Sequence, residues 1–160
     1  GRTGARFAHA FRRAGEAGFR CTVHAGESSG PEGVWDAVEL LGADRIDHGV
    51  RAIEDASLVA MLAERQIPLG ICPTSNLVLG VYPTLADHPI ERLRLAGVRV
   101  SVNTDDPALL GASLIGEYSL CRQTFGWTDD VTRAVARTAI EASFATADVK
   151  ADLLKALGTW

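Results

Sequence analysis

The sequence predicts an α/β protein in which a first helix is followed by four strand–helix units and then by further helices. Short apolar runs alternate along the chain with amphipathic helical patterns. The runs are apolar at nearly every position, which is typical of strands covered on both faces. Their separation of about 23–30 residues suits right-handed crossovers between parallel strands. These observations favour a parallel sheet with helices packed against it.

Each of the four expected strands leads into a polar cluster. In chain order, the runs are Phe19–Val23, Arg45–Asp47, Ile67–Ile71 and Val98–Val102. The polar residues that follow them are, run by run, His24 and Glu27; His48; Ser75 and Asn76; and Asp105 and Asp106. Because the carboxyl ends of parallel strands meet at one edge of the sheet, the sequence predicts a single shared site there.

Helical spacing of apolar residues predicts the remaining elements. The expected helices are Arg6–Ala17, Pro31–Leu41, Leu58–Leu62, Ile90–Leu93, Leu114–Thr124, Asp129–Ala142 and Val149–Leu157. Asp55 and Thr128 are suited to cap the amino ends of the third and sixth of these helices. Pro31 and Pro89 suit helix starts, and Gly97 suits a helix end.

Length and composition narrow the class of protein. The chain has 160 residues, of which 47% are hydrophobic and 22% charged, and these values exclude a disordered or collagen-like chain. The formal charge of −4 argues against nucleic acid as a partner. We find no apolar run of the roughly 18 residues that a membrane span requires, so we expect no membrane partner.

The expected location is the cytoplasm, although the chain itself is expected to be a fragment. Cys21, Cys72 and Cys121 are odd in number and form no CxxC pair, which is typical of free thiols in a reducing compartment. The sequence opens at Gly1 without a charged and then apolar signal segment. A first residue other than methionine indicates a piece of a longer protein.

The strand-end residues have both chemical and structural interpretations. His24 and Glu27 could be a packed histidine and a capping carboxylate, and His48 could be a hydrogen-bonded structural residue. Asp105 and Asp106 could mark a helix amino terminus. Adjacent carboxylates are, however, costly to desolvate without a cation or a hydrogen-bond donor. Two imidazoles and three carboxylates at neighbouring strand ends together favour a Zn²⁺ or similar site and metal-dependent hydrolysis.

The motifs around these residues resemble those of the adenosine deaminase family of metal-dependent amidohydrolases. The matching segments are Thr22–Glu27, Arg45–Gly49, Ile71–Asn76 and Ser101–Pro107, and they occur in the family's order. The resemblance implies a (β/α)8 barrel of the TIM type with one catalytic zinc and a small-molecule purine as substrate. Adenosine or deoxyadenosine is the default substrate, and adenine or another 6-aminopurine is the alternative.

The resemblance also implies roles for individual residues. His24 and Asp105 correspond to zinc ligands, and Glu27 to the acid that protonates purine N1. His48 corresponds to the residue that orients the metal-activated water and takes its proton. Asp106 corresponds to a hydrogen-bond partner of purine N7, and Gly26 lets the main chain approach the purine. Ser75 and Asn76 are expected on a barrel strand, in supporting roles beside the metal.

The chain departs from the family pattern in one respect. The family's first strand carries a His-x-His pair that completes the zinc site, but the four histidines here are His9, His24, His48 and His88. A full barrel needs eight strands and about 250 residues. We therefore expect residues 1–160 to form the carboxyl-terminal half of the catalytic domain, strands five to eight plus terminal helices. The expected partner is the missing amino-terminal half, and the isolated fragment is expected to be inactive.

Two other interpretations remain open from the sequence. The chain could be a non-catalytic α/β domain, or a half-barrel that completes itself by dimerising, with structural carboxylates and histidines. It could also be a doubly wound sheet, whose strand order would not follow the chain.

Overall fold

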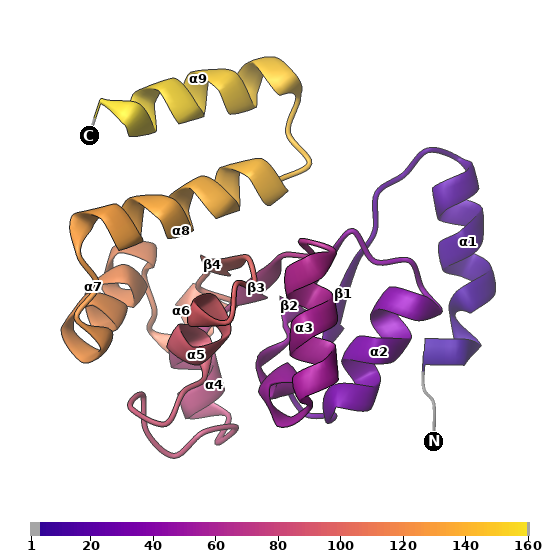
Figure 1. The fold of residues 1–160 in the computed structure, drawn as a ribbon, viewed down its shortest axis with the longest axis horizontal. Helices are drawn as coiled ribbons and strands as arrows, with labels where there is room; N and C mark the ends of the chain where they lie inside the picture. Colours follow the sequence, from indigo (N-terminus) through magenta and orange to yellow (C-terminus); the bar gives the residue numbers. More distant parts are fainter. Residues whose placement is uncertain (1–3, 160) are drawn as a thin grey trace.

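A four-stranded parallel sheet organises the fold. The computed structural model describes residues 4–159. The strands are β1 (Thr22–Ala25), β2 (Arg45–His48), β3 (Leu69–Ile71) and β4 (Val100–Val102). They pair in the order β1-β2-β3-β4, so each strand lies beside its neighbour in sequence (Figure 1). This order contradicts the doubly wound alternative and is the one expected of consecutive barrel strands.

Three of the strands begin later than the sequence predicts, because apolar residues ahead of them close the preceding helices. Ahead of β1, the N–H of Phe19 donates to the carbonyl of Ala14. The N–H of Ile67 donates to the carbonyl of Leu62, and the N–H of Val98 donates to that of Leu93. Gln66 and Gly97, just before them, have φ values of 55° and 87°. This is the Schellman arrangement, in which a left-handed residue ends a helix and an apolar residue follows it.

The longer helices agree with the sequence prediction to within a few residues. They are α1 (Ala8–Glu16), α2 (Pro31–Glu39), α3 (Ala56–Glu64), α5 (Ile90–Leu95), α7 (Leu114–Phe125), α8 (Asp129–Ala142) and α9 (Ala147–Gly158). Both expected caps are confirmed: Asp55 accepts from Ser57 and Leu58 N–H groups, and Thr128 accepts from that of Val131. In the part of the chain that the structure describes, no helix has the length and apolar character needed to cross a bilayer.

Four short helical segments were not among the helices predicted from the sequence, although a helix start at Asp105 and Asp106 was one of its alternatives. They are η1 (Gly4–Arg6), η2 (Val50–Glu54), α4 (Pro73–Val78) and α6 (Pro107–Leu110). The prediction that Ser75 and Asn76 lie on a strand is wrong, since both belong to α4. Pro73 takes the first helical position, where a missing N–H costs nothing, and the strand ends two residues earlier.

The sheet has one apolar and one largely polar face. The expectation of strands covered on both faces is confirmed for β3 and β4, which are buried at every position, but not for β1 and β2, whose alternate positions are partly exposed. The apolar face buries Ala25, Ile46, Leu69, Ile71, Val100 and Val102 in one cluster with residues of α2, α3 and α5. Alternate positions carry Thr22, His24, Arg45, Asp47 and Ser101. On this polar face, His24 and Asp47 lie side by side near the carboxyl ends of β1 and β2.

Candidate functional site

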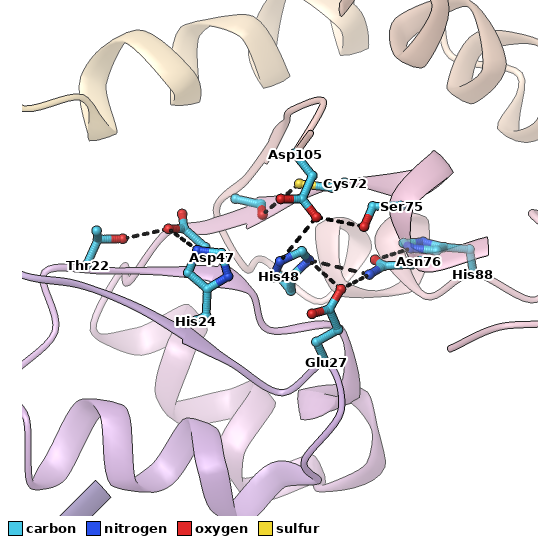
Figure 2. Close-up of polar contacts among 11 residues, drawn as sticks. Thr22, His24, Glu27, Asp47, His48, Cys72, Ser75, Asn76, His88 and Asp105 are labelled. Carbon is cyan, nitrogen blue, oxygen red and sulfur yellow. Dashed lines mark hydrogen bonds and ion pairs between the residues drawn. The ribbon is translucent and has the colours of Figure 1, made fainter. Parts of the chain in front are cut away.

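The segments after the four strands bring most of the predicted site residues together (Figure 2). His24 lies near the end of β1, and His48 is the last residue of β2. The centroids of their two rings are 5.1 Å apart. The turn after β1 contributes Glu27, and α4 contributes Ser75 and Asn76. The loop after β4 contributes Asp105. The sequence prediction of one shared site at this edge of the sheet is consistent with this geometry.

Glu27, His48 and Asn76 form the buried side of the site. Oε1 of Glu27 lies 3.2 Å from Nδ1 of His48 and accepts a 3.0 Å hydrogen bond from Nδ2 of Asn76. Asn76 Nδ2 is also 3.4 Å from His48 Nδ1. His48 is 1% exposed and Asn76 is fully buried, so the three groups are fixed with respect to one another.

Asp105 faces the other ring nitrogen of His48. Its Oδ2 lies 3.9 Å from His48 Nε2 and accepts a 2.7 Å hydrogen bond from the hydroxyl of Ser75. His48 and Asp105 have φ values of 66° and 56°, in the left-handed region that side chains other than glycine rarely adopt. Such strain is often found at functional sites, where it aims a side chain that a relaxed strand end would turn away.

His24 has a different partner. Its Nε2 lies 3.6 Å from Oδ2 of Asp47, which also accepts a 3.0 Å hydrogen bond from the hydroxyl of Thr22. The His24 side chain is 67% exposed, whereas that of Asp47 is 26% exposed. His24 and Asp105 nevertheless line one pocket of about 370 Å³, together with His48, Cys72 and Thr104.

The donor atoms around the pocket fit a divalent metal. Among the described residues, His48, Cys72 and Asp105 offer donor atoms within 4.8 Å of one another. Burial, followed by the charges of Asp105 and Asp47, raises the pKa of the Cys72 thiol to about 12. Imidazole and carboxylate groups are ordinary zinc ligands. His24 and Asp105 both line the pocket, but among the described residues His24 is not in the group of donor atoms that lie within 4.8 Å of one another.

Gly26 and Asp106 lie beside this arrangement. Gly26 has φ +65°, and a Cβ there would come within 2.5 Å of the Val34 side chain and 3.2 Å of Gly49. Internal packing therefore already requires a glycine. Asp106 precedes α6 but makes no side-chain cap hydrogen bond, and it is exposed. The helix start proposed as a structural alternative is present, but the carboxylate does not cap it.

Among the residues that contact the site without a role predicted from the sequence are Asp47, Cys72 and His88. Asp47 and Cys72 lie inside the matching segments Arg45–Gly49 and Ile71–Asn76. Their positions at strand ends could have indicated that they contact the site. His88 fits no motif, yet it is 2% exposed and its Nε2 lies 3.1 Å from Oδ1 of Asn76. His88 lies in the loop between α4 and α5, which has no periodic pattern, so the sequence carries no signal for this contact.

Comparison with known proteins defines the class to which this fold and site belong. The family model described as adenosine deaminase matches residues 1–160. An adenine deaminase from Rhizobium rhizogenes is 50% identical over 94% of the chain and 47% of its own length. An adenosine deaminase from Escherichia coli O1:K1 is 42% identical over 92% of the chain and 44% of its own length.

Solved structures agree with these relatives. The adenine deaminase of Arthrobacter aurescens superposes with a TM-score of 0.94 at 35% identity, covering 98% of this chain and 48% of that one. An amidohydrolase from Burkholderia ambifaria with bound zinc has a TM-score of 0.87 at 33% identity, covering 96% of this chain and 43% of that one. Fold and sequence thus place the chain among the amidohydrolases of the adenosine and adenine deaminase type.

The chain belongs to the adenosine deaminase family. Its four parallel strands match about half of an adenine deaminase TIM barrel. It spans about half the length of the curated relatives that it matches.

Proposed function

We propose that residues 1–160 form the carboxyl-terminal half of a zinc-dependent purine deaminase that hydrolyses the 6-amino group of its substrate and releases ammonia. The observation that carries this proposal is the place of His48, which lines the pocket with Asp105: its Nδ1 lies 3.2 Å from Glu27 and its Nε2 lies 3.9 Å from Asp105. A carboxylic acid and an imidazole at that separation suit acid–base chemistry on one bound ring. Two further zinc ligands are expected from the amino-terminal half.

Adenine is the substrate that similarity favours. The sequence motifs alone made adenosine the default, but the relative at 50% identity is named an adenine deaminase, whereas the adenosine deaminase is 42% identical. The same acid–base groups serve either substrate because both present N1 and a 6-amino group. Discrimination between them depends on room for a ribose at N9.

Each side chain has a proposed task. His24 and Asp105 hold the zinc ion, which when bound supplies an activated water at neutral pH. Glu27 gives a proton to purine N1, which makes C6 more electrophilic. His48 orients the nucleophile and accepts its proton. Asp106 forms a hydrogen bond with purine N7. Gly26, which has no side chain, lets the main chain approach the purine ring.

A direct assay tests this proposal. The full-length protein that carries this chain is incubated with zinc and with either adenine or adenosine, and loss of the adenine absorbance band and release of ammonia are followed. Turnover of adenine with a higher kcat/KM than adenosine is expected. Preference for adenosine would correct the substrate, and failure to deaminate any 6-aminopurine with zinc bound would contradict the proposed function.

A further inference from the structure

A buried chain of hydrogen bonds connects the start of α5 with Glu27. The main-chain N–H of Ile90 donates to Nδ1 of His88 at 3.2 Å. Nε2 of His88 lies 3.1 Å from Oδ1 of Asn76, and Nδ2 of Asn76 donates to Oε1 of Glu27 at 3.0 Å. Figure 2 shows His88 on the far side of Asn76 from Glu27 and His48. His88 therefore reaches the acid–base pair only through Asn76.

The first of these contacts fixes the tautomer of His88. A main-chain N–H can only donate, so Nδ1 must present its lone pair and the ring proton must be on Nε2. Burial, with a smaller contribution from Arg92, lowers the pKa of His88 to about 4, and the ring is neutral at pH 7. The ring of Tyr82, 5.2 Å away centroid to centroid, packs against the imidazole, and its hydroxyl donates to the carbonyl of Val50.

The tautomer in turn fixes the amide of Asn76. Since Nε2–H of His88 donates, Oδ1 of Asn76 must face it, and the NH2 group must face Glu27. The inverted amide would place two donors together at His88 and two acceptors together at Glu27. His88 and the Asn76 amide are buried, so water could not relieve the mismatch at His88.

The amide then distinguishes the two oxygens of Glu27. An oxygen that accepts a hydrogen bond from Asn76 is the worse site for a proton, because in a carboxylic acid the carbonyl oxygen is a better acceptor than the hydroxyl oxygen. The same Oε1 also faces Nδ1 of His48 at 3.2 Å. The acidic proton is thereby directed to Oε2, the oxygen that neither side chain engages.

We propose that His88 is a positioning residue of the deaminase site: by orienting the Asn76 amide, it keeps Oε1 of Glu27 as an acceptor and leaves Oε2 to carry the proton delivered to the substrate. This inference rests on the proposed function, in which Glu27 is the acid. It adds a residue from outside the four motif segments, supplied by the loop before α5.

Two substitutions of His88 separate its two contacts. In His88→Asn, the side-chain oxygen takes the place of Nδ1, so it can still accept a hydrogen bond from the N–H of Ile90. The shorter side chain cannot reach Asn76. His88→Gln places an amide nitrogen near the former Nε2, so it can still donate to Asn76 but loses the acceptor for Ile90. His9→Asn, at an exposed position of α1, is the matched control.

The measurements are kcat, KM, zinc content and thermal midpoint of the full-length protein. His88→Asn is expected to lower kcat about 10- to 100-fold, as loss of an outer partner of a catalytic group commonly does. Its KM should stay within about threefold, because the lost interaction acts on proton transfer and not on ground-state binding. His88→Gln should recover most of kcat even where its thermal midpoint is the lower of the two.

The kcat values of the two variants, compared with their thermal midpoints, test whether His88 positions Asn76. Wild-type kcat in His88→Asn, or loss of kcat in both variants that follows their thermal midpoints, would overturn the inference. An inactive wild-type protein would instead refute the proposed function. If both variants fail to fold, nitrogen-15 NMR of the imidazole in the wild-type protein still tests the relay: the Nε2–H tautomer is expected at pH 7, and the Nδ1–H tautomer or an imidazolium would overturn it.

Discussion

At the scale of single residues, the site depends on two strained positions. His48 and Asp105 both have positive φ, a conformation that costs about 1–3 kcal/mol for a residue with a side chain. Contacts hold them there: His48 is buried between Glu27 and Asp105, and Ser75 donates to Asp105. The strain turns both side chains toward the pocket, so the backbone supplies part of the preorganisation that catalysis requires.

Replacing Glu27 tests the acid directly. Glu27→Gln keeps the shape of the side chain and an oxygen that can accept from Asn76, but it cannot deliver a proton. In the full-length protein kcat should fall about 10²- to 10⁴-fold, the usual contribution of a positioned acid, with bound zinc unchanged. Glu64→Gln, at an exposed position on α3, is the control. Activity of Glu27→Gln near that of the control would assign the proton transfer to another group.

Replacing Ser75 tests the support of Asp105. The Ser75 hydroxyl is fully buried and donates to Asp105 Oδ2 at 2.7 Å, which restrains the carboxylate proposed to hold zinc. Ser75→Ala should weaken zinc binding about 10- to 100-fold, measured by competition with a chelator of known affinity. Ser143→Ala, which removes a hydroxyl bonded to the Ile140 carbonyl at the end of α8, should not. Equal affinities in the two variants would remove Ser75 from the metal site.

The residues of the site differ in how far the sequence could predict them. His24, Glu27, His48 and Asp105 follow apolar runs directly, so strand periodicity alone brought them to one edge. The pairing of His24 with Asp47 could not be predicted, because i to i+2 alternation gives the face of a side chain and not its partner across strands. His88 is reached only through the fold of the loop before α5, which carries no periodic signal.

At the scale of elements, helix ends explain where the prediction of strands was inexact. Ile67 and Val98 are apolar and β-branched, and by pattern they belong to strands, but each closes the helix before it. Gly97 signals one of these helix ends in the sequence. Gln66 does not, because a left-handed glutamine is rare; its side-chain amide donates to the carbonyl of Ala63. The short helices α4 and α6 begin at prolines, a signal that was present at Pro73 and Pro107.

The cap of α3 predicts a pH-dependent stability. Hydrogen bonds from Ser57, from Trp35 of α2 and from the N–H of Leu58 lower the pKa of Asp55 from 3.8 to about 2. Because the folded-state value is the lower one, this stabilisation is complete above the unfolded value of 3.8 and is lost as the pH falls toward about 2.

Asp55→Asn isolates the contribution of the charge, since asparagine is also a good cap. In urea unfolding of the full-length protein, wild type should be the more stable at pH 6, and the difference should shrink between pH 3.8 and about 2. Asp148→Asn, in the first turn of α9, controls for loss of a carboxylate near a helix start. A difference for Asp55→Asn that is independent of pH would contradict the assignment.

At the scale of the whole molecule, the sheet ends at two unpaired strand edges. Within residues 4–159, β1 and β4 each pair on one side only. Beside β1 lies a pocket of about 340 Å³ whose lining includes Phe7, Phe11 and Val23. Phe7 is 57% exposed, and an apolar side chain so placed suits burial under another segment. The helix α8 packs beside β4, and the ring of Phe144, which follows it, lies under the guanidinium groups of Arg20, ahead of β1, and Arg45, at the start of β2.

These edges predict the behaviour of the 160-residue chain on its own. We expect it to lose zinc on dialysis and to show no detectable deamination, because it offers His24 and Asp105 as ligands but has no His-x-His pair, and its strand edges are open to solvent. Metal analysis after dialysis, adenine and adenosine assays, and the mass from size exclusion test this together. A loose monomer or aggregate agrees with a missing half-barrel, whereas a compact dimer would favour a half-barrel that completes itself. Near-stoichiometric zinc with turnover equal to that of the full-length protein would refute the prediction, since the four strands would then be a sufficient catalytic unit.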